Sequence, residues 1–174
     1  MVESWIFLSV LGLGGPQFVP KRVPEFEFPG RKAIHVAVVA MPECPIARQA
    51  VPELKRLHAA NPKVSFQWIV PGVNANDTSW QRFVRDYKLP FAVVADPMNV
   101  SRRRLAVTTS PTAVVLNRRN EVLYWGRIDD RFADVGIQRK LTERSLKLAL
   151  DAAVAGRRPK PDRTEPVGCL LPKL

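Results

Sequence analysis

The sequence predicts an α/β domain in which helices cover both faces of a central mixed β-sheet. Residues 34–40 are an almost unbroken apolar run rich in β-branched side chains, which is typical of an interior strand, and residues 64–70 (VSFQWIV) are predicted to be a second buried strand. Each run is followed by a segment whose apolar residues fall three or four apart, as on one face of a helix. This alternation, ending in a hairpin and a helix, favours a layered α/β architecture.

The first strand, 34–40, leads through Cys44 into a helix whose apolar face carries Ile46, Ala50, Leu54 and Leu57. After the second strand, 64–70, a loop covers 71–77. Asp77 is then a suitable N-cap. The next helix has an aromatic stripe that we interpret as core, composed of Trp80, Phe83, Val84 and Tyr87.

The remaining elements are shorter. We expect a strand at 91–95, a basic helix at 99–105, and a loop from 108 that runs through Pro111 into a strand ending at 117. A polar turn at 118–120 and a strand at 121–128 complete a hairpin. Residues 129–136 are predicted as a loop, and a last helix begins at Thr142 and has Gly156 as its C-cap.

Composition limits the functions to consider. The chain has 174 residues, 46% of them hydrophobic, enough for one domain plus tails. Its net charge of +11 permits binding to nucleic acid, to an anionic membrane or to an acidic partner. However, the basic runs at 102–104, 118–119 and 157–160 lack interleaved aromatics, so we expect solvated faces and make no strong case for nucleic acid. With two cysteines and two histidines and no ligand cluster, no metal or organic cofactor is expected.

We divide the chain into an N-terminal extension (1–30), a main domain (31–156) and a Pro-rich basic arm (157–174) that carries Cys169. The apolar run 5–14 is too short to span a bilayer as a helix. Its length is close to that of the apolar core of a signal peptide, but no basic residues precede it. A truncated signal, a membrane-proximal remnant and a first strand all remain open. The arm is expected to be extended and flexible.

Cys44 is the residue on which the functional prediction depends. At a helix N-terminus, unpaired N–H groups and the helix dipole favour an anion, and the thiolate is the nucleophilic form of cysteine. The alternative is that Cys44 is a small buried hydrophobe, as most free cysteines are. Arg48 and Arg127 are candidates to stabilise a thiolate, although we favour solvated side chains. Asp129 and Asp130 are interpreted as loop caps or partners of nearby arginines, and His35 and His58 as core or surface residues.

The sequence resembles the thioredoxin superfamily, and within it the redoxin or peroxiredoxin-like (AhpC/TSA-type) domains. In that family a strand leads into a cysteine at the start of a helix, here Cys44, and a proline interrupts the helix eight residues later, here Pro52. A cis-proline opens a late strand opposite the cysteine, which Ser110-Pro111-Thr112 resembles. The resemblance implies a thioredoxin-like three-layer fold over about residues 33–156.

Two departures bear on the activity. Dithiol members carry C-x-x-C, but Ala47 occupies the second cysteine position here. Peroxiredoxins carry a threonine three residues before the cysteine and a proline further upstream, where this chain has Met41 and Ala37. The pattern therefore lacks both the local resolving thiol and the features that support efficient reduction of peroxide.

The resemblance implies that Cys44 is the nucleophile and that Pro45, Ser110 and Pro111 contact the substrate, with the Ser110 backbone pairing with a substrate strand. Cys169 is the only other cysteine. It could resolve a mixed disulfide. The alternatives for Cys169 are a thiol that pairs between chains and an idle thiol.

Our first hypothesis is thus a thiol-disulfide oxidoreductase acting on a protein or small-molecule disulfide or oxidised thiol, with an unknown reductant. The alternatives are a peroxidase with antioxidant activity, in which Cys169 condenses with a Cys44 sulfenic acid, and a non-catalytic binding module. Two cysteines and a signal-like N-terminus favour the cell envelope or periplasm over the cytoplasm.

Overall fold

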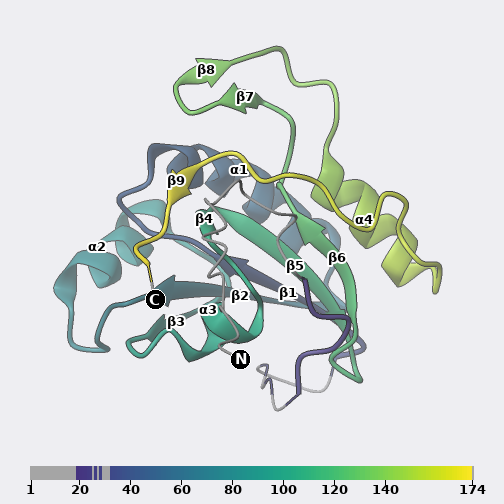
Figure 1. Ribbon diagram of the computed structural model, residues 1–174, viewed down its shortest axis with the longest axis horizontal. Coiled ribbons are helices and arrows are strands. Elements are labelled where there is room, and N and C mark those ends of the chain that lie inside the picture. Colours follow the sequence, from purple (N-terminus) through teal and green to yellow (C-terminus); the bar gives the residue numbers. More distant parts are fainter. Residues whose placement is uncertain (1–18, 25, 27, 29–31, 174) are drawn as a thin grey trace, which may run out of the picture.

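The computed structural model describes residues 19–24, 26, 28 and 32–173 (Figure 1). The apolar run 5–14, with its signal and membrane interpretations, lies outside the described residues. In the part of the chain that is described, no helix is both long and apolar enough to cross a membrane.

A mixed five-stranded sheet, ordered β3-β2-β1-β5-β6, forms the centre of the domain. Strand β1 (Ile34–Val39) pairs in parallel with β2 (Val64–Pro71) and antiparallel with β5 (Thr112–Asn117). Strand β3 (Ala92–Asp96) extends the parallel half, and β6 (Val122–Gly126) forms the predicted hairpin with β5. The two central strands are buried on both faces, which explains their continuous apolar sequences.

Helices α1 (Pro45–Ala60), α2 (Thr78–Tyr87) and α4 (Ser145–Val154) pack on one face of the sheet. Their shared core includes Trp68 and Leu54. The opposite face is covered by α3 (Val100–Arg104) with the residues after it and by Val23 and Phe26 from the N-terminal segment. The layered α/β architecture with helices on both faces is confirmed. Asp77 caps α2 as predicted, accepting a hydrogen bond of 2.8 Å from the Ser79 N–H.

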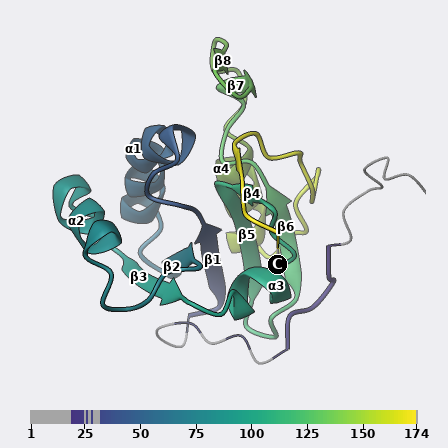
Figure 2. The ribbon, with the colours of Figure 1, turned by 60° about the vertical axis from the view of Figure 1, so that its left-hand side comes forward.

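Three local predictions were wrong. The segment predicted as a loop, 129–136, contributes to a small hairpin of β7 (Phe132–Asp134) and β8 (Ile137–Gln138), which stands out from the body in Figure 2. The last helix begins at Ser145 rather than Thr142, because the Thr142 N–H donates to the Asp130 carboxylate at 2.9 Å and is held outside the helix. Its C-cap is Ala155, and Gly156 is the left-handed residue that follows, with φ +71°.

The C-terminal arm is extended but docked against the domain. It follows the edge of β6, where the Thr164 N–H donates to the Trp125 carbonyl at 3.1 Å, and then crosses to β9 (Cys169–Leu170). Strand β9 pairs antiparallel with β4 (Thr109–Ser110). Beyond it, Arg102 donates to the Pro172 carbonyl at 2.6 Å. Arg102 is therefore buried and holds the end of the arm, whereas the sequence predicted a solvated basic run.

Candidate active site

Cys44 occupies the N-cap of α1 at the end of the loop that follows β1. The Cys44 N–H donates to the Met41 carbonyl, and the Cys44 carbonyl accepts the first backbone bond of the helix from Arg48, each at 3.1 Å. Pro45 begins the helix and has no N–H to offer. The side chain of Cys44 is only 2% exposed. A thiolate at this position would lie where the helix dipole and the unpaired N–H groups of the first turn favour a negative charge.

Ser110 and Pro111 lie directly against Cys44. The Cys44 Sγ is 3.2 Å from the Ser110 carbonyl oxygen, and the Ser110–Pro111 peptide bond is cis. The Ser110 hydroxyl accepts a hydrogen bond of 2.9 Å from the Met41 N–H, which ties the cysteine loop to β4. The structure thus brings together Cys44, Pro45, Ser110 and Pro111, which the sequence assigned to one site.

Cys169 completes the cluster. Cys44 and Cys169, 125 residues apart in the chain, form a disulfide with a Cα–Cα distance of 6.1 Å. In the pairing of β4 with β9, Cys169 lies directly opposite Ser110. Both cysteines are therefore engaged with each other within one chain, rather than one of them being an idle thiol or a link between chains.

Sequence reasoning missed two residues that seat the arm. A Cβ atom on Gly168 would lie 1.9 Å from the Ser110 carbonyl oxygen, so only glycine fits there without a shift of backbone. Leu171 is 6% exposed and packs in the core on the α3 side of the sheet, near Leu105 and Val107. A glycine directly before a cysteine in a Pro-rich segment was the available signal for such a close approach.

A small, open pocket of about 20 Å³ lies near the disulfide. Its apolar lining consists of Ile46, Ala50, Pro111, Ile128, Phe132 and Val167, the last of these from the arm. Its polar lining includes Arg127, Asp129 and Arg131. The pocket therefore joins the start of α1, the strand after Ser110, the β7–β8 hairpin and the arm.

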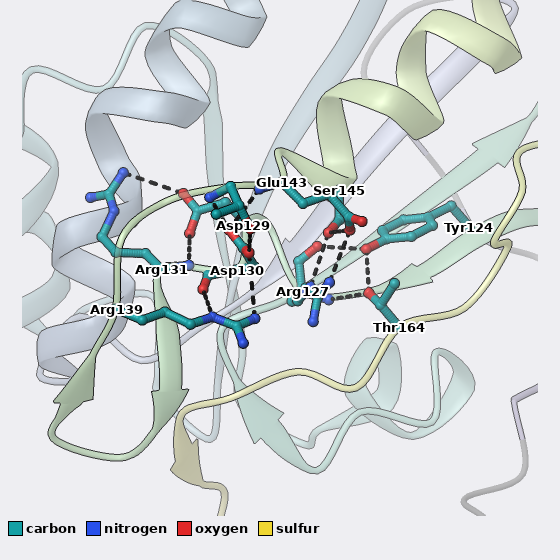
Figure 3. Close-up of polar contacts among 10 residues, drawn as sticks. Tyr124, Arg127, Asp129, Asp130, Arg131, Arg139, Glu143, Ser145 and Thr164 are labelled. Carbon is teal, nitrogen blue, oxygen red and sulfur yellow. Dashed lines mark hydrogen bonds and ion pairs between the residues drawn. The ribbon is translucent and has the colours of Figure 1, made fainter.

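The two arginines of this pocket are paired, as Figure 3 shows. Arg127 bonds to Glu143 at 2.9 Å, and Arg131 bonds to Asp129 at 3.3 Å. Ser145 and Arg127 both donate to the Glu143 carboxylate, and these hydrogen bonds hold the pKa of Glu143 below its usual value. The pairing leaves the charged wall of the pocket close to neutral. Arg127 is thus held by Glu143 and Ser145, whereas the sequence predicted a solvated side chain.

Asp130 and Tyr124 are buried residues close to the arginines of the pocket (Figure 3). Asp130 accepts hydrogen bonds from the backbone of Thr142 and Glu143 at 2.9 and 2.8 Å. Although burial opposes ionisation, these bonds and the Thr142 hydroxyl hold the pKa of Asp130 well below its usual range. Burial raises the pKa of Tyr124 to about 12. The Tyr124 hydroxyl meets the Thr164 hydroxyl at 2.5 Å and so fixes the arm above β6.

The other candidate side chains have structural partners. Arg48 donates to the Pro42 carbonyl at 2.6 Å. The ring of His35 stacks on Phe28 at 4.3 Å, and burial lowers the pKa of His35. His58 packs on Phe66. Within the residues that the structure describes, no group of three or more His, Cys, Asp or Glu side chains is arranged to hold a metal ion.

Comparisons with known proteins match the fold but not the sequence. No family model matches the chain, and no curated protein matches it significantly. An uncharacterized conserved protein from Geobacillus kaustophilus has a similar structure, with a TM-score of 0.75, 21% identity, and 93% of this chain and 98% of that chain covered. The hypothetical protein SMc02350 from Sinorhizobium meliloti has a TM-score of 0.71, 17% identity, and coverages of 90% and 94%.

A third similar structure belongs to a protein assigned as the thiol:disulfide interchange protein DsbE of Chlorobium tepidum. The TM-score is 0.57 and the identity 16%, with 81% of this chain and 98% of that chain covered. The mixed sheet, the layers and the likeness to these structures show a thioredoxin-like fold. The fold that the sequence resemblance implied is confirmed.

Proposed function

We propose that this protein is a thiol-disulfide oxidoreductase of the redoxin type, in which Cys44 is the nucleophile and Cys169 the resolving cysteine. The observation that carries the proposal is the disulfide between these residues at the N-terminus of α1, against Ser110 and Pro111. A helix N-terminus favours the thiolate form of the attacking cysteine. Ala47 occupies the position of the second cysteine in C-x-x-C, so Cys44 has no thiol partner there. The pairing of β9 with β4 places Cys169 next to Cys44 instead.

The reaction transfers two electrons from the protein to its partner. In the reduced protein, the Cys44 thiolate attacks one sulfur of the partner disulfide and forms a mixed disulfide, and the other partner sulfur leaves as a thiolate. The Cys169 thiolate then attacks Cys44, forming the Cys44–Cys169 disulfide and releasing the second partner thiolate. The partner disulfide is thereby reduced and the protein oxidised. An external dithiol must reduce the protein again before the next turnover.

The structural neighbours support this class of chemistry. The Chlorobium tepidum protein of similar structure bears the name of a thiol:disulfide interchange protein. We propose a protein or small-molecule disulfide as partner, and the cell envelope as the compartment, because disulfides persist in oxidising surroundings.

Reduction of insulin by dithiothreitol, followed by turbidity, tests the proposal with the wild type, Cys44→Ser and Cys169→Ser. We expect Cys44→Ser to fall to the uncatalysed rate. In a separate reaction without dithiothreitol, reduced Cys169→Ser should accumulate a one-to-one mixed disulfide with insulin that is visible by intact mass. Leu170→Ala, at a position 80% exposed beside Cys169, is the matched control and should keep the wild-type rate. If Cys44→Ser retains the wild-type rate, the protein is not an oxidoreductase of this kind, and the binding module is favoured.

A further inference from the structure

Residues 167–171 lie on the domain as a bound peptide would. They reach β4 as an antiparallel strand in which Cys169 faces Ser110 and Leu170 faces Thr109. The Leu171 N–H continues the pairing by donating to the Thr108 carbonyl at 2.8 Å. Adding a strand to an exposed edge gives affinity through the backbone, while pockets for the side chains give selectivity.

Each side chain of this segment has a distinct environment. Val167 forms part of the apolar wall of the pocket beside the disulfide. Gly168 lies so close to the Ser110 carbonyl that no Cβ atom fits between them. Leu170 is 80% exposed, and Leu171 is buried on the far side of the sheet. The edge therefore accepts an apolar residue two before the cysteine, glycine directly before it, any residue after it, and an apolar residue two after it.

With the arm in place Cys44 is only 2% exposed and is bonded to Cys169, so a partner cysteine that bonds to Cys44 takes the place of Cys169. We propose that the arm is a template of the substrate: the protein acts on extended protein or peptide disulfides whose attacked cysteine lies in the pattern apolar-Gly-Cys-X-apolar. This inference rests on the proposed function and names its substrate class. The partial neutralisation of Arg127 and Arg131 by Glu143 and Asp129 favours an apolar rather than an acidic residue at the position of Val167, in the wall of this pocket.

The template also explains how product leaves. After Cys44 forms the mixed disulfide, partner strand and arm compete for the same edge of β4. When Cys169 attacks Cys44 and releases the partner thiolate, its own strand takes the vacated backbone positions. The attack of Cys169 on the mixed disulfide and the displacement of the reduced partner from β4 then occur in one step.

The test uses full-length Cys169→Ser, in which Cys44 is the only thiol, and synthetic peptides with the sequence of residues 166–172, Pro-Val-Gly-Cys-Leu-Leu-Pro. The peptide cysteine is joined as a mixed disulfide to 5-thio-2-nitrobenzoate. Attack by Cys44 on the peptide sulfur releases the coloured arylthiolate, so absorbance gives a second-order rate constant. Variants replace the peptide glycine with alanine, the valine or second leucine with serine, and, as control, the exposed first leucine with serine.

We expect the alanine variant and each of the two apolar-to-serine variants to react roughly tenfold or more slowly than the parent, and the control variant to react within about twofold of it. The arm of the protein competes equally with every peptide, so it does not change the ratios of the rate constants between peptides. Equal rates for all peptides would overturn the template while leaving Cys44 an active thiol. A lack of reaction with the parent peptide and with the symmetrical aryl disulfide would instead refute the proposed function itself.

Discussion

Replacing Leu171 with alanine tests the coupling between docking of the arm and the redox state of the two cysteines. Leu171 is two residues from Cys169 and is buried against the core near Leu105 and Val107. If the arm leaves β4 when the disulfide is reduced, the packing energy of Leu171 stabilises only the oxidised form. Loss of that packing then makes the disulfide easier to reduce.

The expected size follows from the burial. Truncating a buried leucine to alanine costs about 2 kcal/mol at the low end of the usual range, which suits a site near the chain terminus. For a two-electron couple this corresponds to a potential roughly 40 mV more oxidising. It also corresponds to a roughly 30-fold change in the equilibrium constant with a reference dithiol.

The assay equilibrates each protein in buffers of defined dithiothreitol ratio, quenches by alkylation, and counts the alkylated cysteines by mass. Leu170→Ala is the matched control, because this side chain is 80% exposed, and its potential should equal that of the wild type. A shift below about 10 mV for Leu171→Ala would refute the reasoning, since Leu171 would then pack equally well in both redox states.

Three further outcomes are expected. Gly126→Ala places a Cβ atom 2.3 Å from the Thr164 carbonyl, so it should cost about 1–3 kcal/mol of unfolding free energy and hasten proteolysis of the arm; an arm as resistant as the wild type's would contradict this. Asp130→Asn should cost about 1.5–3 kcal/mol near pH 7 by urea unfolding. Because folding lowers the pKa of Asp130, its ionised carboxylate stabilises the protein above about pH 4 and loses this effect as the pH falls further. The difference in unfolding free energy between the wild type and Asp130→Asn should therefore narrow below about pH 4. A difference that stays constant down to about pH 2 would argue against the stabilising role of the hydrogen bonds that Asp130 accepts. Reducing the Cys44–Cys169 disulfide, which joins residues 125 apart in the chain, should lower stability by up to roughly 5 kcal/mol in the loop-entropy model, and unchanged unfolding would contradict this estimate.

Much of the fold could be predicted because local patterns and burial agree. The continuous apolar runs are the central strands, and the aromatic stripe of α2 packs on Trp68 through Phe83. The β7–β8 hairpin could not be read in advance, because exposed Val135 and Ile137 give it no apolar periodicity. The late start of α4 depends on Thr142 binding Asp130, a contact between a loop and a buried carboxylate that no propensity encodes.

The residues of the candidate site could be named from the sequence, but the seating of Cys169 could not be predicted. The strand, cysteine and helix give Cys44 its place through local sequence, and the resemblance supplies Ser110 and Pro111. The seating of Cys169 depends on contacts across the whole chain, above all the close approach of Gly168 to Ser110 and the burial of Leu171. A Pro-rich composition indicates an extended arm but does not say which edge the arm will meet.

The central claim is that Cys44 and Cys169 act together on a partner disulfide, and a single turnover tests it most directly. Fully reduced protein is mixed with one equivalent of a peptide disulfide, quenched with acid after increasing times, and analysed by intact mass and by counting partner thiols. The account predicts that the protein loses two hydrogens as two partner thiols appear, with the internal bond mapped to Cys44 and Cys169. Partner thiols that appear without this bond, or a protein whose mass does not change while the partner stays oxidised, would contradict it.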